Sequence, residues 1–141
     1  MFVLDTCIVS ELRKSRSQAD PGLIGWADGV PATEMYLSTM SLCELELGVL
    51  LAERRDRATG SVLRTWLSEA VMPTFARRLL PIDGQVAALA ASLHMPDLAP
   101  LADSLILIAA TALAHDMALV TRNVADFDRF VGLLVINPFE T

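Results

Sequence analysis

The chain is poor in cysteine, histidine and lysine, and each shortage excludes a class of site or protein. Its two cysteines, Cys7 and Cys43, are too few for a disulfide framework and form no CxxC pair. Two histidines supply too few ligands for a typical zinc site. No apolar run approaches the roughly 20 residues that span a bilayer, and no basic leader with a cleavage site opens the chain. We therefore expect a cytoplasmic chain with reduced thiols and no membrane contact.

The composition is that of one folded domain, which we expect over residues 1–141. Hydrophobic residues make up 53% of the chain and charged residues 20%, with a mean hydropathy of +0.47. This apolar excess favours a sheet covered on both faces, or a surface that binds a partner. The net charge of −6 argues against a nucleic-acid partner. However, the arginines cluster at 13–16, 54–57 and 77–78, where they either contact phosphates or form solvated helix ends.

Apolar segments of strand type alternate with helical patterns along the whole chain. Strands are expected at 2–4, 35–40, 78–83, 117–123 and 133–139, and helices at 6–14, 23–28, 41–56, 60–72, 84–94 and 103–115. Ser41 and Glu44 have the spacing of a capping box, and Pro73 is expected to stop the helix before it. Strands alternating with helices indicate an α/β fold with a parallel sheet between helical layers.

Several acidic or polar residues follow the expected strands. Asp5 comes directly after the first strand and Glu44 lies near the start of the helix after the second. Asp103 opens a later helix, and Asn123 and Asp126 lie in the loop after the fourth strand. Because ligands of parallel sheets bind outside the carboxyl ends of the strands, these side chains are candidates for one site.

Two neighbours of Glu44 complete the interpretation of its helix. Glu46 lies about 200° round the helix from Glu44, so we interpret it as solvated. Gly48 shares the face of Glu44, and we expect it to let neighbouring backbone approach that face.

Carboxylates gathered in one cleft stay ionised only if a cation holds them. Oxygen ligands without histidine or cysteine suit Mg²⁺ or Mn²⁺, and such a site can hydrolyse phosphodiesters. Each acid also has a simpler interpretation. Asp5 could cap the first helix, Glu44 could close the capping box, and Asp126 could be a surface turn residue.

Four segments resemble the PIN-domain ribonucleases, specifically the VapC-type toxins of bacterial toxin–antitoxin pairs: FVLDTCIVSEL, STMSLCELELGVL, PLADSLILIAATALAHDMALVTRNVADF and INPF. The resemblance covers nearly the whole chain, with the motifs in the family order. It implies a three-layer α/β/α sandwich with a mostly parallel central sheet. It also implies an endoribonuclease that hydrolyses RNA and a VapB-like antitoxin partner, with homodimers common.

The resemblance also assigns roles to individual residues. It implies that Asp5, Glu44 and Asp103 hold Mg²⁺ or Mn²⁺, with Asn123 or Asp126 completing the catalytic set. Thr6 matches the hydroxyl residue that usually follows the first aspartate. With Thr6, three arginines are candidate substrate-binding residues: Arg13, Arg16 and Arg122.

Two positions depart from the family pattern. Cys7 stands where the family often has asparagine, and a thiol cannot make an amide's hydrogen bonds. Relatives usually read D..IAATA, whereas here two further residues separate Asp103 from that motif, which rotates a helix by about 200°. Asp103 reaches the site only from the loop or first turn, or if a bulge absorbs the excess, and Asp97 is the alternative acid.

Three other functions fit the acids less well. An aspartyl-phosphate phosphatase resembling DxDxT needs an acid where Cys7 stands, and a receiver domain needs a late lysine, whereas Lys14 is the sole lysine. The remaining alternative is a catalytically inactive PIN-like module that binds its antitoxin or itself. For either PIN-like reading we expect a partner to lay an apolar face over residues 8–14 and 45–56 and to send a basic side chain towards the acids.

Overall fold

The structure is a computed structural model that describes residues 1–95 and 103–139. Its strands are β1 (Phe2–Leu4), β2 (Met35–Ser38), β3 (Leu79–Leu80), β4 (Ala118–Val120) and β5 (Val135–Ile136). Its α-helices are α1 (Thr6–Leu12), α2 (Pro21–Asp28), α3 (Thr39–Arg55), α4 (Arg57–Trp66), α5 (Met72–Phe75), α6 (Gly84–His94), α7 (Asp103–Ala114) and α8 (Val124–Phe127). A 3-10 turn, Ala32–Glu34, precedes β2, and a π-helical turn, Leu67–Val71, joins α4 to α5.

The five strands form one parallel sheet in the order β3-β2-β1-β4-β5. The chain moves outward from β1 in one direction and then returns to the other side of β1 with β4. The strand order therefore reverses between β1 and β4, and a crevice at the carboxyl end of these two strands is the usual ligand position in such sheets.

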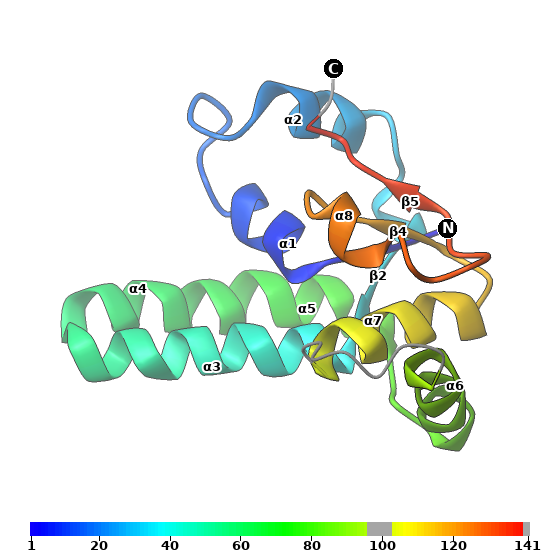
Figure 1. Ribbon diagram of the computed structural model, residues 1–141. Helices are drawn as coiled ribbons and strands as arrows, with labels where there is room; N and C mark the ends of the chain where they lie inside the picture. The colour runs from blue at the N-terminus through cyan, green and yellow to red at the C-terminus, as the bar shows by residue number, and fades with distance from the viewer. Residues whose placement is uncertain (96–102, 140–141) are drawn as a thin grey trace.

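Alternating side chains of each strand enter two separate cores. Val3 and Leu119 pack with α6, α7 and α8, whereas Leu4 and Val120 pack with α1, α2 and α3. Figure 1 shows the resulting layers, with α6 and α7 on one side of the strands and α1 and α2 on the other. The expected α/β/α sandwich is confirmed.

The helical hairpin of α3 and α4 corrects two expectations about glycine and glutamate. Gly48 lies in the open, since a Cβ there would meet nothing within 4 Å, and the close approach occurs instead at Gly60, where a Cβ would lie 2.4 Å from Glu53 Cα. Glu46 is not simply solvated: both of its carboxylate oxygens accept hydrogen bonds of 2.8 Å from Arg64. The hairpin projects away from the sheet in Figure 1.

Two expected helix ends are also wrong. Ser38, not Ser41, caps α3, and its Oγ accepts from the Met40 N–H at 3.0 Å, because β2 ends two residues earlier than expected. Pro73 does not stop the helix before it but lies in the first turn of α5, directly after the π-helical turn Leu67–Val71.

Candidate active site

Asp5 lies at the carboxyl end of β1, at the position where the strand order reverses. Its backbone N–H donates to Val120 O of β4 at 2.9 Å, so the residue is fixed to both central strands. The residue is 5% exposed. The pairing of β1 with β4 therefore sets the position of Asp5, at the end of the sheet where ligands of such folds bind.

Two hydrogen bonds of 2.8 Å fix the carboxylate of Asp5. The backbone N–H of Thr6 donates to Oδ1 at 2.8 Å, which also caps α1. The hydroxyl of Thr121, fully buried at the end of β4, donates to Oδ2 at 2.8 Å and accepts from the Asn123 N–H at 3.0 Å. Hydrogen bonds to both oxygens hold the plane of the carboxylate.

Glu44 joins this site through Thr6. The Thr6 hydroxyl donates to Glu44 Oε1 at 2.7 Å, while the backbone of the same residue binds Asp5. Because α3 begins at Thr39, Glu44 lies in the second turn and closes no capping box. Ser41, the expected cap, is buried, and its Oγ has no hydrogen-bond partner within the described ranges. The interpretation of Glu44 as a mere capping residue is therefore excluded.

The charges of Asp5 and Glu44 suit a cation. The four ion pairs that the described residues form involve other acids: Glu11, Asp28, Glu46 and Glu53. A buried carboxylate without a basic partner is costly unless a cation neutralises it. The all-oxygen donor set of Asp5, Glu44 and Thr6 fits Mg²⁺ or Mn²⁺. Over residues 1–95 and 103–139, no three His, Cys, Asp or Glu side chains form a group that could hold a metal ion.

Asp103 is not brought to Asp5 and Glu44. It is the first residue of α7, is exposed, and lines a cavity of about 260 Å³ with α6 residues including Ala91 and His94. The family spacing before IAATA falls instead on Leu105, about 200° round the helix. No bulge absorbs the two further residues, since α7 is α-helical from Asp103 to Ala114. Asp103 as a metal ligand stays a prediction, and Asp97 lies outside the described residues.

Asn123 and Asp126 belong to the short helix after β4. Both side chains are exposed, and Asn123 forms no side-chain cap of α8. The contribution of Asn123 to the site is its backbone N–H, which binds Thr121. Catalytic roles for the two side chains stay predictions.

The three candidate arginines differ in how free they are to contact a substrate. Arg13 lines a cavity of about 250 Å³ together with Thr6 and Glu44. The guanidinium of Arg122 lies 4.5 Å from the centre of the Phe139 ring. Arg16 forms two hydrogen bonds with Asp28, at 2.8 and 3.1 Å. Arg13 and Arg122 are therefore better placed than Arg16 for a phosphate.

Cys7 contributes a thiol beside Asp5. Its Sγ donates to Asp5 Oδ2 at 3.8 Å and lies 3.8 Å from the Thr121 hydroxyl. Burial, followed by smaller effects that include the charge of Asp5, raises the pKa of the Cys7 thiol. The thiol is therefore protonated at neutral pH and acts as a weak donor. Cys43 is exposed, and both cysteines are free.

Thr121 is the site residue that the sequence analysis missed. Its signal was its place directly after the apolar run of β4, which pairs with β1 so that Val120 lies opposite Leu4. Residues that follow paired positions of neighbouring parallel strands lie side by side.

Comparison with known proteins identifies the family. The chain is 34% identical to the toxin FitB of Neisseria gonorrhoeae over 145 residues, covering 99% of each, and 34% identical to the VapC ribonuclease Y4jK of Sinorhizobium fredii over 148 residues, again covering 99% of each. The chain belongs to the VapC family of PIN-domain toxins. No model of a protein family matches it.

Solved structures of VapC-family complexes have the same fold. The FitAcB complex of N. gonorrhoeae contains a chain that superimposes with a TM-score of 0.87 at 31% identity, covering all of both chains. A chain of VapBC2 from Rickettsia felis, bound to a promoter DNA fragment, superimposes with a TM-score of 0.73 at 17% identity. No helix in the described part of this VapC-family chain is long and apolar enough to cross a membrane.

Proposed function

We propose that this VapC-family chain is a divalent-metal-dependent endoribonuclease and the toxin of a type II toxin–antitoxin pair. The observation that carries the proposal is the hydrogen-bonded set of Asp5, Thr6 and Glu44 at the point where the strand order reverses, with no basic partner among the described residues. The names of the relatives support an action on RNA, since two full-length relatives are a toxin and a ribonuclease.

In this proposal Asp5 and Glu44 hold Mg²⁺ or Mn²⁺, and Thr6 and Thr121 orient them. When bound, the ion lowers the pKa of a water molecule and neutralises phosphate charge. Thr121 and the Thr6 backbone keep the Asp5 carboxylate in one plane, and the Thr6 hydroxyl keeps Glu44 beside it. Arg13, which shares a cavity with Glu44, is positioned to contact a phosphate of the RNA.

Cleavage of single-stranded RNA by the purified chain, across a series of Mg²⁺ and Mn²⁺ concentrations, tests this function. We expect cleavage that requires the ion, stops with a chelator, and is lost in Asp5→Asn. Glu69→Gln is the matched control, because Glu69 is an exposed acid in the π-helical turn. RNA cleavage that persists unchanged in the chelator would refute metal dependence.

The second candidate is a VapC-family module without cleavage, which binds its antitoxin or itself. The observation that favours it is the placement of Asp103, which leaves two of the three predicted metal-binding acids together. Failure of the wild-type chain to cleave RNA at any Mn²⁺ concentration, combined with retained antitoxin binding, would select this candidate.

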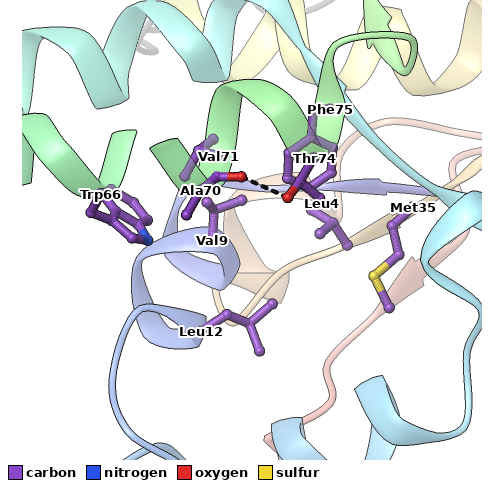
Figure 2. Close-up of a pocket in the computed structure, with 9 residues that line it drawn as sticks. All are labelled: Leu4, Val9, Leu12, Met35, Trp66, Ala70, Val71, Thr74 and Phe75. Carbon is purple, nitrogen blue, oxygen red and sulfur yellow. Dashed lines mark hydrogen bonds between the residues drawn. The ribbon is translucent and has the colours of Figure 1, made fainter. Parts of the chain in front are cut away.

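An apolar cavity offers a place for the antitoxin. It has a volume of about 190 Å³, lies between α1 and the α4–α5 region, and is lined by residues such as Leu12 and Trp66. Figure 2 shows Val9 of α1 beside Ala70 and Val71, with the Thr74 hydroxyl bound to Ala70 O. We propose that a VapB-like antitoxin fills this cavity with apolar side chains. The cavity includes part of the segment expected to be covered at 8–14, whereas no residue of 45–56 lines it.

The same antitoxin is proposed to send a basic side chain towards Asp5 and Glu44. Its cation would occupy the position of the metal, so antitoxin binding and Mg²⁺ would compete. Antitoxin affinity measured for wild type and Asp5→Asn across a Mg²⁺ series tests this. We expect Mg²⁺ to weaken binding to wild type, and Asp5→Asn to bind less tightly and without Mg²⁺ dependence. An antitoxin affinity that neither Mg²⁺ nor Asp5→Asn changes would overturn the proposed competition between the basic side chain and the metal.

A homodimer is the remaining proposal from the family. Apolar side chains on the outer face of α3 support it, since Leu47 is 54% exposed and Leu50 51% exposed. Light scattering of wild type and of Leu47→Glu should show a dimer and a monomer, respectively. An unchanged dimer in the variant would place the interface elsewhere.

A further inference from the structure

A further hollow lies beside the carboxyl end of β5, between that strand and α2. It has a volume of about 370 Å³, and its lining includes Gly22, Gly25, Trp26, Ile136 and Asn137. We call it the α2–β5 pocket. Its volume is within the range of small-molecule pockets, roughly 300–1,000 Å³. The proposed chemistry at Asp5 and Glu44 makes no use of it.

We propose that the α2–β5 pocket binds one unpaired base of the RNA strand whose backbone is cleaved at Asp5 and Glu44. The inference rests on the proposed ribonuclease function and adds a base-binding subsite to it. It is carried by three features of the pocket: an aromatic ring, an oriented amide and a path to the active site.

The aromatic ring belongs to Trp26. It packs against the ring of Phe2, with 5.3 Å between the centroids and an interplanar angle of 84°, which holds the indole in a fixed plane. Aromatic side chains of this kind stack with unpaired bases whatever the base sequence. The helix surface beside Trp26 is bare, since a Cβ on Gly25 would meet nothing within 4 Å. A flat ring can therefore approach the indole.

The oriented amide belongs to Asn137. Its Oδ1 accepts from the Phe139 N–H at 3.0 Å, so Nδ2 is the group of this amide that can donate to a ligand. Ring nitrogens and carbonyl oxygens of bases accept such hydrogen bonds. Stacking on one side and a fixed donor on another suit a base better than an aliphatic side chain.

The path to the active site follows the strand register. Ile136 pairs with Val120 of β4, which pairs with Leu4 of β1, so the end of β5 lies two strand spacings, about 10 Å, from Asp5. Arg122 stands on this path, with its guanidinium over the Phe139 ring. An RNA strand with one base in the α2–β5 pocket can thus place a phosphate beside Arg122 on its way to Asp5 and Glu44.

The electrostatics of α2 also permit an RNA strand. Asp28 is the one acid within this helix, and Arg16 neutralises it through two hydrogen bonds. The hydrogen bond from Arg16 lowers the pKa of Asp28, which keeps the pair ionised at neutral pH. The other acid at this helix is its N-cap, Asp20, whose carboxylate accepts from the Leu23 N–H at 3.0 Å and is thereby held at the first turn of α2.

Binding of a labelled single-stranded RNA to the full chain in a chelator tests the subsite without cleavage. The probes are an oligonucleotide of mixed sequence and an abasic strand of the same length. Gly25→Leu adds a side chain whose Cβ would meet nothing within 4 Å, and Gly84→Leu is the matched control, because a Cβ there also meets nothing within 4 Å. We expect Gly25→Leu to weaken binding of the base-containing RNA by about tenfold and to leave the abasic strand unaffected.

Substitutions of Trp26 and Arg122 separate stacking from charge. Trp26→Phe should retain binding, because it keeps an aromatic face, whereas Trp26→Leu should lose about as much as Gly25→Leu. Arg122→Gln should weaken both probes and reduce the dependence of log affinity on log salt by about one contact.

The outcomes distinguish this subsite from the ribonuclease function. RNA cleavage by wild type with equal binding of both probes, or with Gly25→Leu and Trp26→Leu unchanged, would overturn the subsite and leave the nuclease intact. A wild-type chain that neither binds nor cleaves RNA would overturn the ribonuclease proposal, and the subsite with it.

Discussion

Of the three acids that the family resemblance assigns to the metal, Asp5 and Asp103 lie in regions of this VapC-family chain that hold them differently. Asp5 is 5% exposed, follows a central strand and accepts hydrogen bonds from Thr6 and Thr121. Asp103 is exposed at the start of α7 and lines a cavity with α6.

The difference shows how far a motif can be trusted when its structural support changes. An acid directly after a strand reaches the sheet edge whatever the helices do, because strand pairing places it there. An acid on a helix depends on rotation, and two further residues turn it by about 200°. An aspartate in a matching motif is therefore strong evidence for a site residue when it follows a strand, and weak evidence when it lies on a helix.

The largest expected effect is that of Asp5→Asn. We expect it to lower RNA cleavage by about 10³-fold or more, because the proposed metal loses its buried ligand. A second measurement needs no activity: Mn²⁺ should raise the melting temperature of wild type but not of the variant. Full cleavage by Asp5→Asn would remove the catalytic assignment.

Loss of either orienting hydroxyl should have the next largest effect. Thr6→Val breaks the 2.7 Å bond to Glu44, and Thr121→Val breaks the 2.8 Å bond to Asp5. We expect each to lower metal affinity or cleavage by about 10–100-fold, the usual cost of removing a partner of a metal ligand. Thr6→Ser and Thr121→Ser keep the hydroxyl and are the controls. Equal defects in the valine and serine variants would indicate a packing role instead.

Asp103→Asn should have a smaller effect. The placement of Asp103 beside α6 leads us to expect a change in cleavage of at most about threefold, because a solvated charge outside the site is screened. A loss as large as that of Asp5→Asn would show that Asp103 does bind the metal, as the resemblance predicts.

Leu105→Asp sharpens the same comparison. It places an acid at the family spacing before IAATA, and we expect it to increase the affinity for Mn²⁺, measured by thermal shift. A variant that stays folded with an unchanged Mn²⁺ affinity would mean that the helix register does not decide which acid reaches the metal.

The smallest expected effect concerns the two thiols. Because burial raises the pKa of Cys7, less of it is thiolate, and iodoacetamide should label the exposed Cys43 first at neutral pH. Labelling of Cys43 should leave RNA cleavage unchanged. Peptide mass spectrometry over time measures the order, and faster labelling of Cys7 would contradict its placement beside Asp5.

Local sequence patterns were sufficient for the elements themselves. The strand at 2–4 and the helix at 84–94 were predicted with the observed bounds, because their apolar patterns are local signals. Errors arose where two signals competed within a few residues. Ser41 and Ser38 both suit a helix cap, and the end of β2 decided between them.

The sequence by itself determined the α/β class, the layers and the position of Asp5, since hydrophobic periodicity and the alternation of strands with helices are patterns of neighbouring residues. Only the tertiary structure decided the partners of these acids. Thr121 lies 116 residues from Asp5 along the chain, and Glu44 lies 38 residues from Thr6. Such contacts depend on the strand order and on the rotation of each helix, and neither is encoded in a local pattern.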